Sequence, residues 1–415
     1  MRTNRTPKKT DSGTKKRTYE ETHPWLTFVA QLKNSPLTLW MNLGAIQSKC
    51  EHVANVMLPP DVAVKLLQVY LAKGVQATTA IEGNTLTEDD VLERVQGVRK
   101  KLPLSKEYLG REVDNVIDAC NSIQDVVLKG TDHDAKLTVE GIRHFNKMVL
   151  SGLALEDHVQ PGEFRKVSVG VGTYRGAPAQ DCEFLLEKMC QWINAEIVPP
   201  NDSQRIAFGV IRAVLAHLYL AWIHPFGDGN GRTARLVELQ ILLSVGVPNI
   251  ASHLLSNHYN QTRAEYYRQL EYASKSGGDI VQFLGYAAQG LFDGLNETID
   301  RIRQFQVEVT WRDYVYQQFS SENGSAADRR RRVALDLWPH RQTPISSSAI
   351  TTLTPQIAAM YATKTHKTVI RDVNSLVAMG LIVKLPGRRI VINFGKLLSF
   401  VPPRKLPEII PSAAK

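Results

Sequence analysis

Cysteine is scarce in this chain, and its few thiols do not show the spacing of a metal site or of a disulfide framework. The 415 residues include Cys50, Cys120, Cys182 and Cys190, and no two of them form a Cys-x-x-Cys pair. Disulfides persist in oxidising compartments, whereas cytoplasmic thiols stay reduced. We therefore expect four free thiols and a cytoplasmic protein.

The sequence also lacks a long uncharged apolar segment. The basic N-terminus is not followed by the apolar stretch of a signal peptide. The longest apolar run, Ile206 to Ile223, is interrupted by Arg212 and His217. A membrane span needs about 20 predominantly apolar residues. We therefore expect this run to be a buried core helix and the protein not to associate with a membrane.

Acidic residues are fewer than basic ones, and the net charge is +9. Most of this excess lies in the first 18 residues, where seven Lys or Arg residues and one Asp give +6. Such a run is typical of a solvated, disordered tail, although contact with nucleic acid is an alternative. The apolar content of 43% is ordinary for a globular protein, and the length allows two or three domains.

One polar stretch concentrates residues that can carry chemistry. Residues 224–235 read HPFGDGNGRTAR and lie between two apolar helix candidates. His224 titrates near neutrality and could accept a proton from a hydroxyl. Asp228 offers the oxygen ligands that Mg²⁺ prefers. Arg232 and Arg235 are three residues apart, on nearly the same face of a helix.

The glycines of this stretch and the helix that follows it favour an anion. Glycine lets backbone N–H groups approach a ligand closely, and a helix N-terminus favours phosphate. Arginine suits bidentate contact with phosphate oxygens. The pattern therefore predicts a nucleotide-phosphate site with a general base and a metal ion. The alternative is a surface turn with solvated arginines, and the density of polar and glycine residues favours the site.

The same stretch resembles the full signature of the Fic-domain family, whose members mostly transfer AMP from ATP to a hydroxyl side chain of a target protein. A related branch that phosphorylates has Ala-Asn-Lys where this chain has Gly-Asn-Gly, so the resemblance favours AMP transfer. It implies that His224 is the catalytic base and Asp228 the Mg²⁺ ligand. It also implies that the residues holding the triphosphate of ATP are Gly229, Asn230, Gly231, Arg232, Thr233, Ala234 and Arg235.

A second motif precedes this signature. Thr78 and Glu82 are four residues apart, and so lie on one face of a helix that Gly83 and Asn84 would end. Taken alone, Glu82 would be an ordinary surface glutamate. Beside the signature, the segment resembles the family's inhibitory motif, Ser/Thr-x-x-x-Glu-Gly/Asn. We then expect Glu82 to pair with Arg235 where the γ-phosphate would bind, and to misalign ATP.

Two further segments complete the expected site. The alternation from Val167 onward, ended by residues 174–178, predicts a β-hairpin. It is either a structural hairpin or, by resemblance, the family's flap, in which Val167, Ser168, Val169 and Gly170 line the nucleotide. Tyr266 and Tyr267 resemble a family pattern whose tyrosine approaches the adenosine, although core packing is the alternative.

Beyond residue 319 the pattern changes. Two helix candidates, a third helix at residues 365–379 and a β-hairpin resemble a winged helix-turn-helix. DNA binding and use in dimerisation or target docking both remain open. The side chains that would contact DNA are Lys364, His366, Lys367, Arg371, Arg388 and Arg389.

Together these patterns predict a mainly α-helical protein: a helical Fic core with a short β-hairpin flap, plus a C-terminal winged helix-turn-helix. The expected function is that of a protein adenylyltransferase that uses ATP and Mg²⁺, modifies a Ser, Thr or Tyr of a target protein or of itself, and is autoinhibited by Glu82. Alternatives are a DNA-binding regulator that uses the pocket as a sensor, and a Fic enzyme that removes AMP or transfers another nucleotide. A homodimer is a further possibility. The expected divisions are a disordered basic tail at 1–21, an N-terminal helical region with the inhibitory helix at 22–130, the catalytic core at 131–319, a linker at 320–326, the winged helix at 327–402 and a tail at 403–415.

Overall fold

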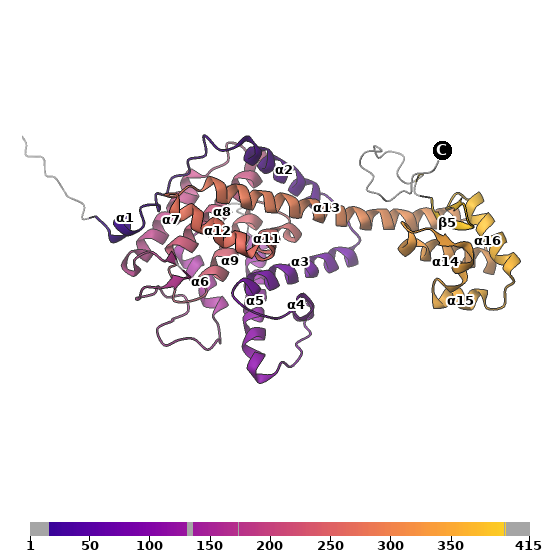
Figure 1. The fold of residues 1–415 in the computed structure, drawn as a ribbon, viewed down its shortest axis with the longest axis horizontal. Coiled ribbons are helices and arrows are strands. Elements are labelled where there is room, and N and C mark those ends of the chain that lie inside the picture. The colour runs from indigo at the N-terminus through magenta and orange to yellow at the C-terminus, as the bar shows by residue number, and fades with distance from the viewer. Residues whose placement is uncertain (1–15, 131–135, 173, 394, 396–415) are drawn as a thin grey trace, which may run out of the picture. The chain divides into compact units, whose positions relative to one another are not determined.

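Helices make up most of the chain that the structure describes (Figure 1). The computed structural model describes residues 16–130, 136–172, 174–393 and 395. Residues 1–15 of the predicted basic tail and the whole of the predicted tail at 403–415 lie outside the described residues. The chain divides into two units, Met1–Ile299 and Asp300–Lys415.

Among its described residues, the first unit is helical apart from one two-stranded sheet and an isolated bridge between Phe164 and Phe226. Its helices are α1 (Thr18–Thr22), α2 (Leu37–Ala54), α3 (Pro60–Ile81), α4 (Glu88–Val95), α5 (Glu107–Lys129), α6 (Val139–Val149), α7 (Cys182–Glu196), α8 (Arg205–Ile223), α9 (Asn230–Ser244), α10 (Asn249–Ser252), α11 (Leu254–Gln261) and α12 (Arg263–Lys275). Short 3₁₀ turns precede α5, α7 and α8. The long helix α13 (Val281–Gln318) begins in this unit.

The centre of this unit is the pair α8 and α9, which pack against each other. Almost every residue of α8 is buried, because the helix is apolar on all sides and is covered by α2, α7 and α9. By length and composition the helical segment Asp202–Ile223 could cross a membrane, but 83% of its most apolar window is buried inside the protein. The prediction of a buried core helix is therefore confirmed.

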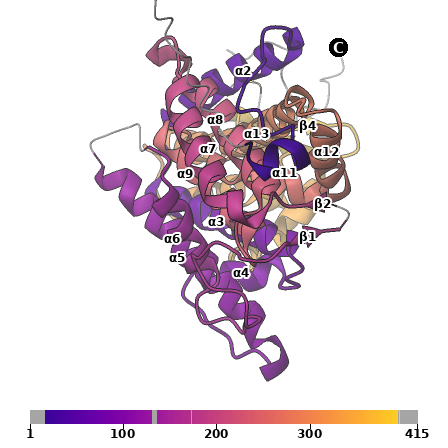
Figure 2. The same ribbon diagram turned by 90° about the vertical axis from the view of Figure 1, so that its left-hand side faces the viewer.

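Three helices bring their side chains to the N-terminal half of α9. Helices α5 and α6 lie side by side and both contact α9, as does α3 (Figure 2). Helix α3 begins at Pro60, whose fixed backbone suits the first turn. It ends before Gly83, which has a φ of 101° that side-chain-bearing residues rarely adopt. The end of α3 is thereby fixed beside α9.

Ordered structure begins earlier than the predicted start near His23. Helix α1 begins at Thr18, and Tyr19 is buried. The backbone N–H of Tyr19 donates to Asp181 Oδ2 at 2.9 Å, and Arg17 pairs with the same carboxylate at 3.3 Å. Asp181 is about 160 residues away in the chain, so no local pattern could reveal this anchor.

The predicted hairpin is present but shorter than expected. Strands β1 (Gly170–Val171) and β2 (Tyr174–Arg175) are antiparallel and contain two residues each, so the alternation at Val167 and Val169 does not form a strand. The reason lies in Arg165, whose guanidinium donates to the Val167 carbonyl at 2.7 Å. A side chain therefore satisfies a backbone group that a longer ladder would have paired.

The second unit contains α14 (Ser325–Asp336), α15 (Pro355–Tyr361) and α16 (His366–Ala378) beside a three-stranded antiparallel sheet. The sheet consists of β3 (Ile345–Ser346), β4 (Ile382–Leu385) and β5 (Arg389–Ile392) in the order β3–β5–β4. The hairpin β4–β5 agrees with the sequence prediction, whereas β3 was not predicted because it is only two residues long.

The two units divide inside α13, between Ile299 and Asp300. This helix continues across the division because its sequence holds no proline that would break it. The predicted boundary at residue 319 coincides instead with the end of α13 at Gln318.

Candidate active site

A tight loop joins α8 to α9 and carries His224. This residue ends α8 in a left-handed conformation, with φ 50° and ψ 59°, and its N–H donates to the Leu220 carbonyl at 2.9 Å. The loop is closed from inside by Asn230, whose amide donates to the Phe226 carbonyl and accepts from the Phe226 N–H, both at 2.9 Å. The side chain of Asn230 is thus used to shape the loop.

Gly229 needs to be glycine for two reasons. Its φ is 74°, and a Cβ atom there would lie 3.1 Å from Asn146 Nδ2 and 3.2 Å from Leu150. Asn146, on α6, donates to the Asp228 carbonyl at 2.9 Å. Thr233 donates back to the Gly229 carbonyl at 2.8 Å, and both it and Ala234 are buried. These residues therefore hold the loop against α6.

A buried arginine that the sequence did not single out fixes His224. Arg165 is 3% exposed, and its Nε donates to the His224 carbonyl at 2.7 Å. The same guanidinium donates to the carbonyls of Ala177 and Ile223. One side chain therefore ties the end of α8 to the hairpin segment. Only its place in a Gly-Glu-Phe-Arg stretch before the hairpin could have drawn attention to it.

The imidazole of His224 is buried, and its surroundings favour the neutral form. Burial lowers its pKa from the ordinary 6.5 to about 4, and the charge of Arg165 acts in the same direction. A histidine with this pKa is neutral at pH 7, so one ring nitrogen is available as a base.

Arg235 is almost fully buried, and its guanidinium is hydrogen-bonded by residues at the C-terminal end of α3. Its Nε donates to Thr78 Oγ1 at 2.5 Å, and Nη2 donates to the Thr78 carbonyl at 3.0 Å. Nη2 also donates to Glu82 Oε1 at 2.6 Å. The structure thus brings together the three residues that the sequence had placed in one inhibitory contact.

Glu82 remains charged in this contact. Burial raises the pKa of its carboxyl, but the charge and hydrogen bond of Arg235 outweigh burial, and the pKa lies below its ordinary value. A Cβ atom at Gly231 would collide with Glu82 Oε1. The carboxylate therefore lies directly against the first turn of α9, where unpaired N–H groups favour a negative charge.

The end of α3 is also held from the other side by Arg263, which was not predicted. Its guanidinium donates to the Ile81 carbonyl at 2.5 Å and to the Ala80 carbonyl at 3.2 Å. The Tyr267 hydroxyl donates weakly to the same Ile81 carbonyl at 3.4 Å. Arg263 thus takes up carbonyls that the helix leaves unpaired at its C-terminus.

A cavity of about 660 Å³ opens over these groups. This is within the usual size range of ligand sites. It contains His224, Gly231 and Arg235 together with both predicted tyrosines, of which Tyr266 is buried and Tyr267 is 39% exposed. The remaining lining residues are Ile81, Glu82, Gly172, Tyr174, Ala221, Trp222, Ala264, Arg268, Leu270 and Glu271.

Arg232 differs from Arg235 in its surroundings. It does not line the cavity, and it is 6% exposed. Its Nη1 donates to Glu112 Oε1 at 2.6 Å, and its Nη2 donates to Asp228 Oδ1 at 3.2 Å. Glu112, on α5, was not predicted from the sequence.

Asp228 presents a half-exposed carboxylate on the loop between α8 and α9. Its side chain is 50% exposed, and Oδ1 accepts from the Gly229 N–H at 2.5 Å as well as from Arg232. In the part of the chain that the structure describes, no group of three or more His, Cys, Asp or Glu residues could hold a metal. An Mg²⁺ ion at Asp228 would therefore complete its oxygen shell with phosphate and water.

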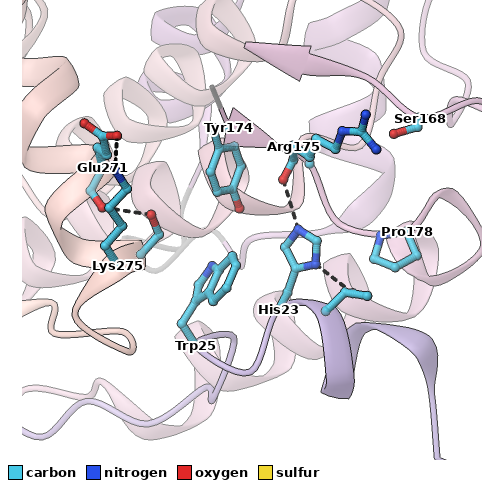
Figure 3. A pocket seen from close by; sticks show the side chains of 11 residues that line it. His23, Trp25, Ser168, Tyr174, Arg175, Pro178, Glu271 and Lys275 are labelled. Atoms are coloured by element: carbon cyan, nitrogen blue, oxygen red, sulfur yellow. Dashed lines mark hydrogen bonds and ion pairs between the residues drawn. The ribbon is translucent and has the colours of Figure 1, made fainter. Parts of the chain in front are cut away.

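The segment predicted to line a nucleotide borders a second pocket of about 470 Å³ (Figure 3). Ser168 lines it, whereas Val167 is 46% exposed and Gly170 begins β1. His23 and Trp25 form its opposite side, and the His23 ring bonds to the Arg175 carbonyl at 2.9 Å. The two pockets share Tyr174 and Glu271.

The sequence is similar to known proteins over the region that contains this site. Residues 136–242 match the family model described as "Fic/DOC family". The chain is 31% identical over 214 residues to protein adenylyltransferase fic-1 of Caenorhabditis elegans, covering 51% of this chain and 38% of the relative. It is 28% identical over 261 residues to protein adenylyltransferase Fic of Drosophila grimshawi, covering 62% and 48%. The chain thus spans less than half the length of these two relatives.

A solved structure shows the same fold. A Fic family protein from Desulfovibrio desulfuricans G20 superposes with a TM-score of 0.53 at 18% identity, covering 88% of this chain and 98% of that one. The loop of His224 and the first turns of α9 lie inside the matched residues 136–242. Residues 136–242, which include the His224 loop, are therefore similar to the Fic/DOC family, and the chain shares the fold of the solved Fic family protein.

Proposed function

We propose that this protein transfers AMP from ATP to a Ser, Thr or Tyr hydroxyl of a target protein, and that Glu82 restrains this reaction. One observation carries the proposal: a neutral histidine and an ion-paired arginine line the same 660 Å³ cavity, His224 as the base and Arg235 as the anion site. The names of the two relatives, both protein adenylyltransferases, support it.

The chain's own residues would perform three tasks. His224 accepts the proton of the incoming hydroxyl, whose oxygen bonds to the α-phosphorus while the bond to the β-phosphate breaks and pyrophosphate leaves. Asp228 would hold Mg²⁺, which neutralises charge on the triphosphate. Arg235, released from Glu82, and the first N–H groups of α9 would hold the γ- and β-phosphates. Such catalysis consists of positioning and charge stabilisation.

Glu82 would restrain the reaction by occupying the anion site. Its carboxylate lies 2.6 Å from Arg235 Nη2 and against Gly231, so a γ-phosphate could not take the same place. ATP would then bind with its α-phosphate displaced from His224. A displacement of about 1 Å can cost on the order of 100-fold in rate.

The test is incorporation of label from ATP carrying ³²P at the α- or the γ-phosphate, with Mg²⁺. We expect strong α-label on Glu82→Gly, little on the wild type and none on Glu82→Gly combined with His224→Ala. Label retained without His224 would contradict its role as base. Incorporation of γ-label instead would replace AMP transfer by phosphorylation. Incubation of pre-labelled protein without ATP would reveal an enzyme that removes AMP, and other labelled nucleotides would test donor choice.

Several further features belong to this proposal. The four cysteines are buried, unpaired thiols, which supports a reducing compartment such as the cytoplasm. Self-modification would appear as label on the enzyme itself. A homodimer would appear in sedimentation. Residues 22–130 would form the regulatory region and 131–319 the catalytic core. The predicted linker at 320–326 is shorter than expected, because α14 begins at Ser325.

A second candidate function is DNA binding by residues 327–402. Three helices with the sheet β3–β5–β4 have the element order of a winged helix-turn-helix. All six predicted contact residues are exposed, four at or near the start of α16 and two at the β4–β5 turn. Arg329 pairs with Asp372 at 2.8 Å and fixes α14 against α16. Sequence-selective binding that weakens with salt, and that Lys367→Ala with Arg371→Ala abolishes, would support this function.

A further inference from the structure

A series of hydrogen-bonded, buried polar side chains connects the segment after α3 to the Asp228 loop. It includes one carboxylate, Glu112, that the proposed reaction does not use. Glu112 lies in its middle. Its Oε2 accepts from Asn84 Nδ2 at 2.9 Å, and its Oε1 accepts from Arg232 Nη1 at 2.6 Å. Arg232 Nη2 then donates to Asp228 Oδ1 at 3.2 Å.

Only one end of this hydrogen-bonded series, Asp228, reaches the solvent. Asn84 and Glu112 are each 7% exposed and Arg232 is 6% exposed, whereas the Asp228 side chain is 50% exposed. The two terminal nitrogens of Arg232 are both engaged by carboxylates, and the residue is absent from the cavity lining. Arg232 is therefore directed at Asp228 and not at the cavity that would receive a triphosphate.

The energetics indicate a role other than stability. Burying an ion pair removes two charges from water, and an apolar pair of similar volume would often stabilise the fold equally well or better. The contact between Arg232 and Asp228 joins a buried guanidinium to a half-exposed carboxylate at 3.2 Å. Because solvent screens the exposed partner, this contact alone would hold the Asp228 carboxylate only weakly. The planar guanidinium group of Arg232 can fix the Asp228 carboxylate through Nη2 once Glu112 holds its other terminal nitrogen, Nη1.

We propose that Glu112 is a positioning residue: it holds Arg232 so that Arg232 fixes the Asp228 carboxylate for a divalent cation bound with the nucleotide. Glu112 contacts neither the cation nor the nucleotide. This inference rests on the proposed function only in assuming that the ligand is a nucleoside triphosphate with a divalent cation.

The test measures cation binding directly. Free Mn²⁺ is titrated by electron paramagnetic resonance in the presence of the non-transferable analogue α,β-methylene-ATP, with Glu82→Gly as the parent protein. Adding Glu112→Gln is expected to weaken Mn²⁺ binding about 10-fold, because Arg232, the outer-shell partner of Asp228, loses its fixed orientation, and loss of an outer-shell contact typically costs 10–100-fold. Affinity for the analogue in EDTA should stay within about twofold of the parent, because Arg232 does not face the nucleotide. The matched control is Glu93→Gln, which loses a surface pair with Lys100.

Three outcomes would overturn the inference. Unchanged Mn²⁺ affinity in Glu112→Gln shows that Glu112 does not position Asp228, and a parent that binds no Mn²⁺ shows that Asp228 is not a cation site. Lost affinity in EDTA shows that Arg232 binds phosphate itself. If Glu112→Gln does not fold, Glu112→Gln combined with Arg232→Gln removes both charges and should show the same weakening. A weakened Mn²⁺ affinity without any AMP transfer would refute the proposed function and leave this inference standing.

Discussion

Replacing Glu82 by glutamine should destabilise the protein and at the same time make it respond more strongly to ATP. Arg235 is 2% exposed in its side chain, whereas Glu82 is 32% exposed. Removing one partner of a fully buried pair costs about 3–5 kcal/mol. Because solvent screens Glu82, we expect a smaller loss of about 1–3 kcal/mol in the free energy of unfolding. The melting temperature of the first unit should then fall by about 2–10 °C.

A triphosphate would replace the missing negative charge, so ATP should raise the melting temperature of Glu82→Gln more than that of the wild type. The matched control is Glu93→Gln. The Glu93 side chain is 34% exposed and lies 2.5 Å from Lys100, but Lys100 is 68% exposed. Differential scanning fluorimetry with and without ATP measures both effects. Equal melting temperatures and equal ATP responses for the two variants would refute the view that Glu82 occupies an anion site.

Three further predictions follow from the same contacts. Arg165→Lys loses most of its carbonyl contacts around His224 and should lower AMP incorporation in the Glu82→Gly background about 100-fold; unchanged incorporation would exclude a positioning role. The new methyl group of Gly231→Ala would collide with Glu82, so this substitution should destabilise the wild type by about 1–3 kcal/mol. It should destabilise Glu82→Gly much less. A double-mutant cycle measured by urea unfolding checks the difference, and equal losses in both backgrounds would contradict it. His224 and His253 each have a pKa of about 4 in the folded state and 6.5 as the ordinary value. The unfolded chain therefore binds protons first, and stability should fall as pH falls from about 6.5 to 4; urea unfolding at pH 7, 5.5 and 4.5 checks this, and a flat profile would contradict it.

The sequence predicted the site better where its residues are close together in the chain. His224, Asp228 and Arg235 lie within twelve residues of one another, so their grouping is visible in the sequence itself. Glu82 was predicted from the resemblance of its segment to the inhibitory motif, and not from its local pattern alone. Local patterns also predicted the core helix at Ile206 to Ile223 and the helix at residues 365–379, because apolar periodicity and glycine breaks are visible over ten residues.

The parts that the sequence did not reveal depend on contacts between distant segments. Arg165 and Glu112 look like surface residues until the fold encloses them with carbonyls and with Arg232. The early start at Thr18 depends on Asp181. The different surroundings of Arg232 and Arg235 could not be predicted either, because nothing local indicates which of two arginines on one helix faces the cavity.

The most direct test of the account is the intact mass of the protein after incubation with ATP and Mg²⁺. The account predicts that Glu82→Gly gains the mass of one or more AMP groups, that the wild type gains little, and that Glu82→Gly with His224→Ala gains none. A gain equal to phosphate, an equal gain in the wild type, or no gain in Glu82→Gly would contradict it.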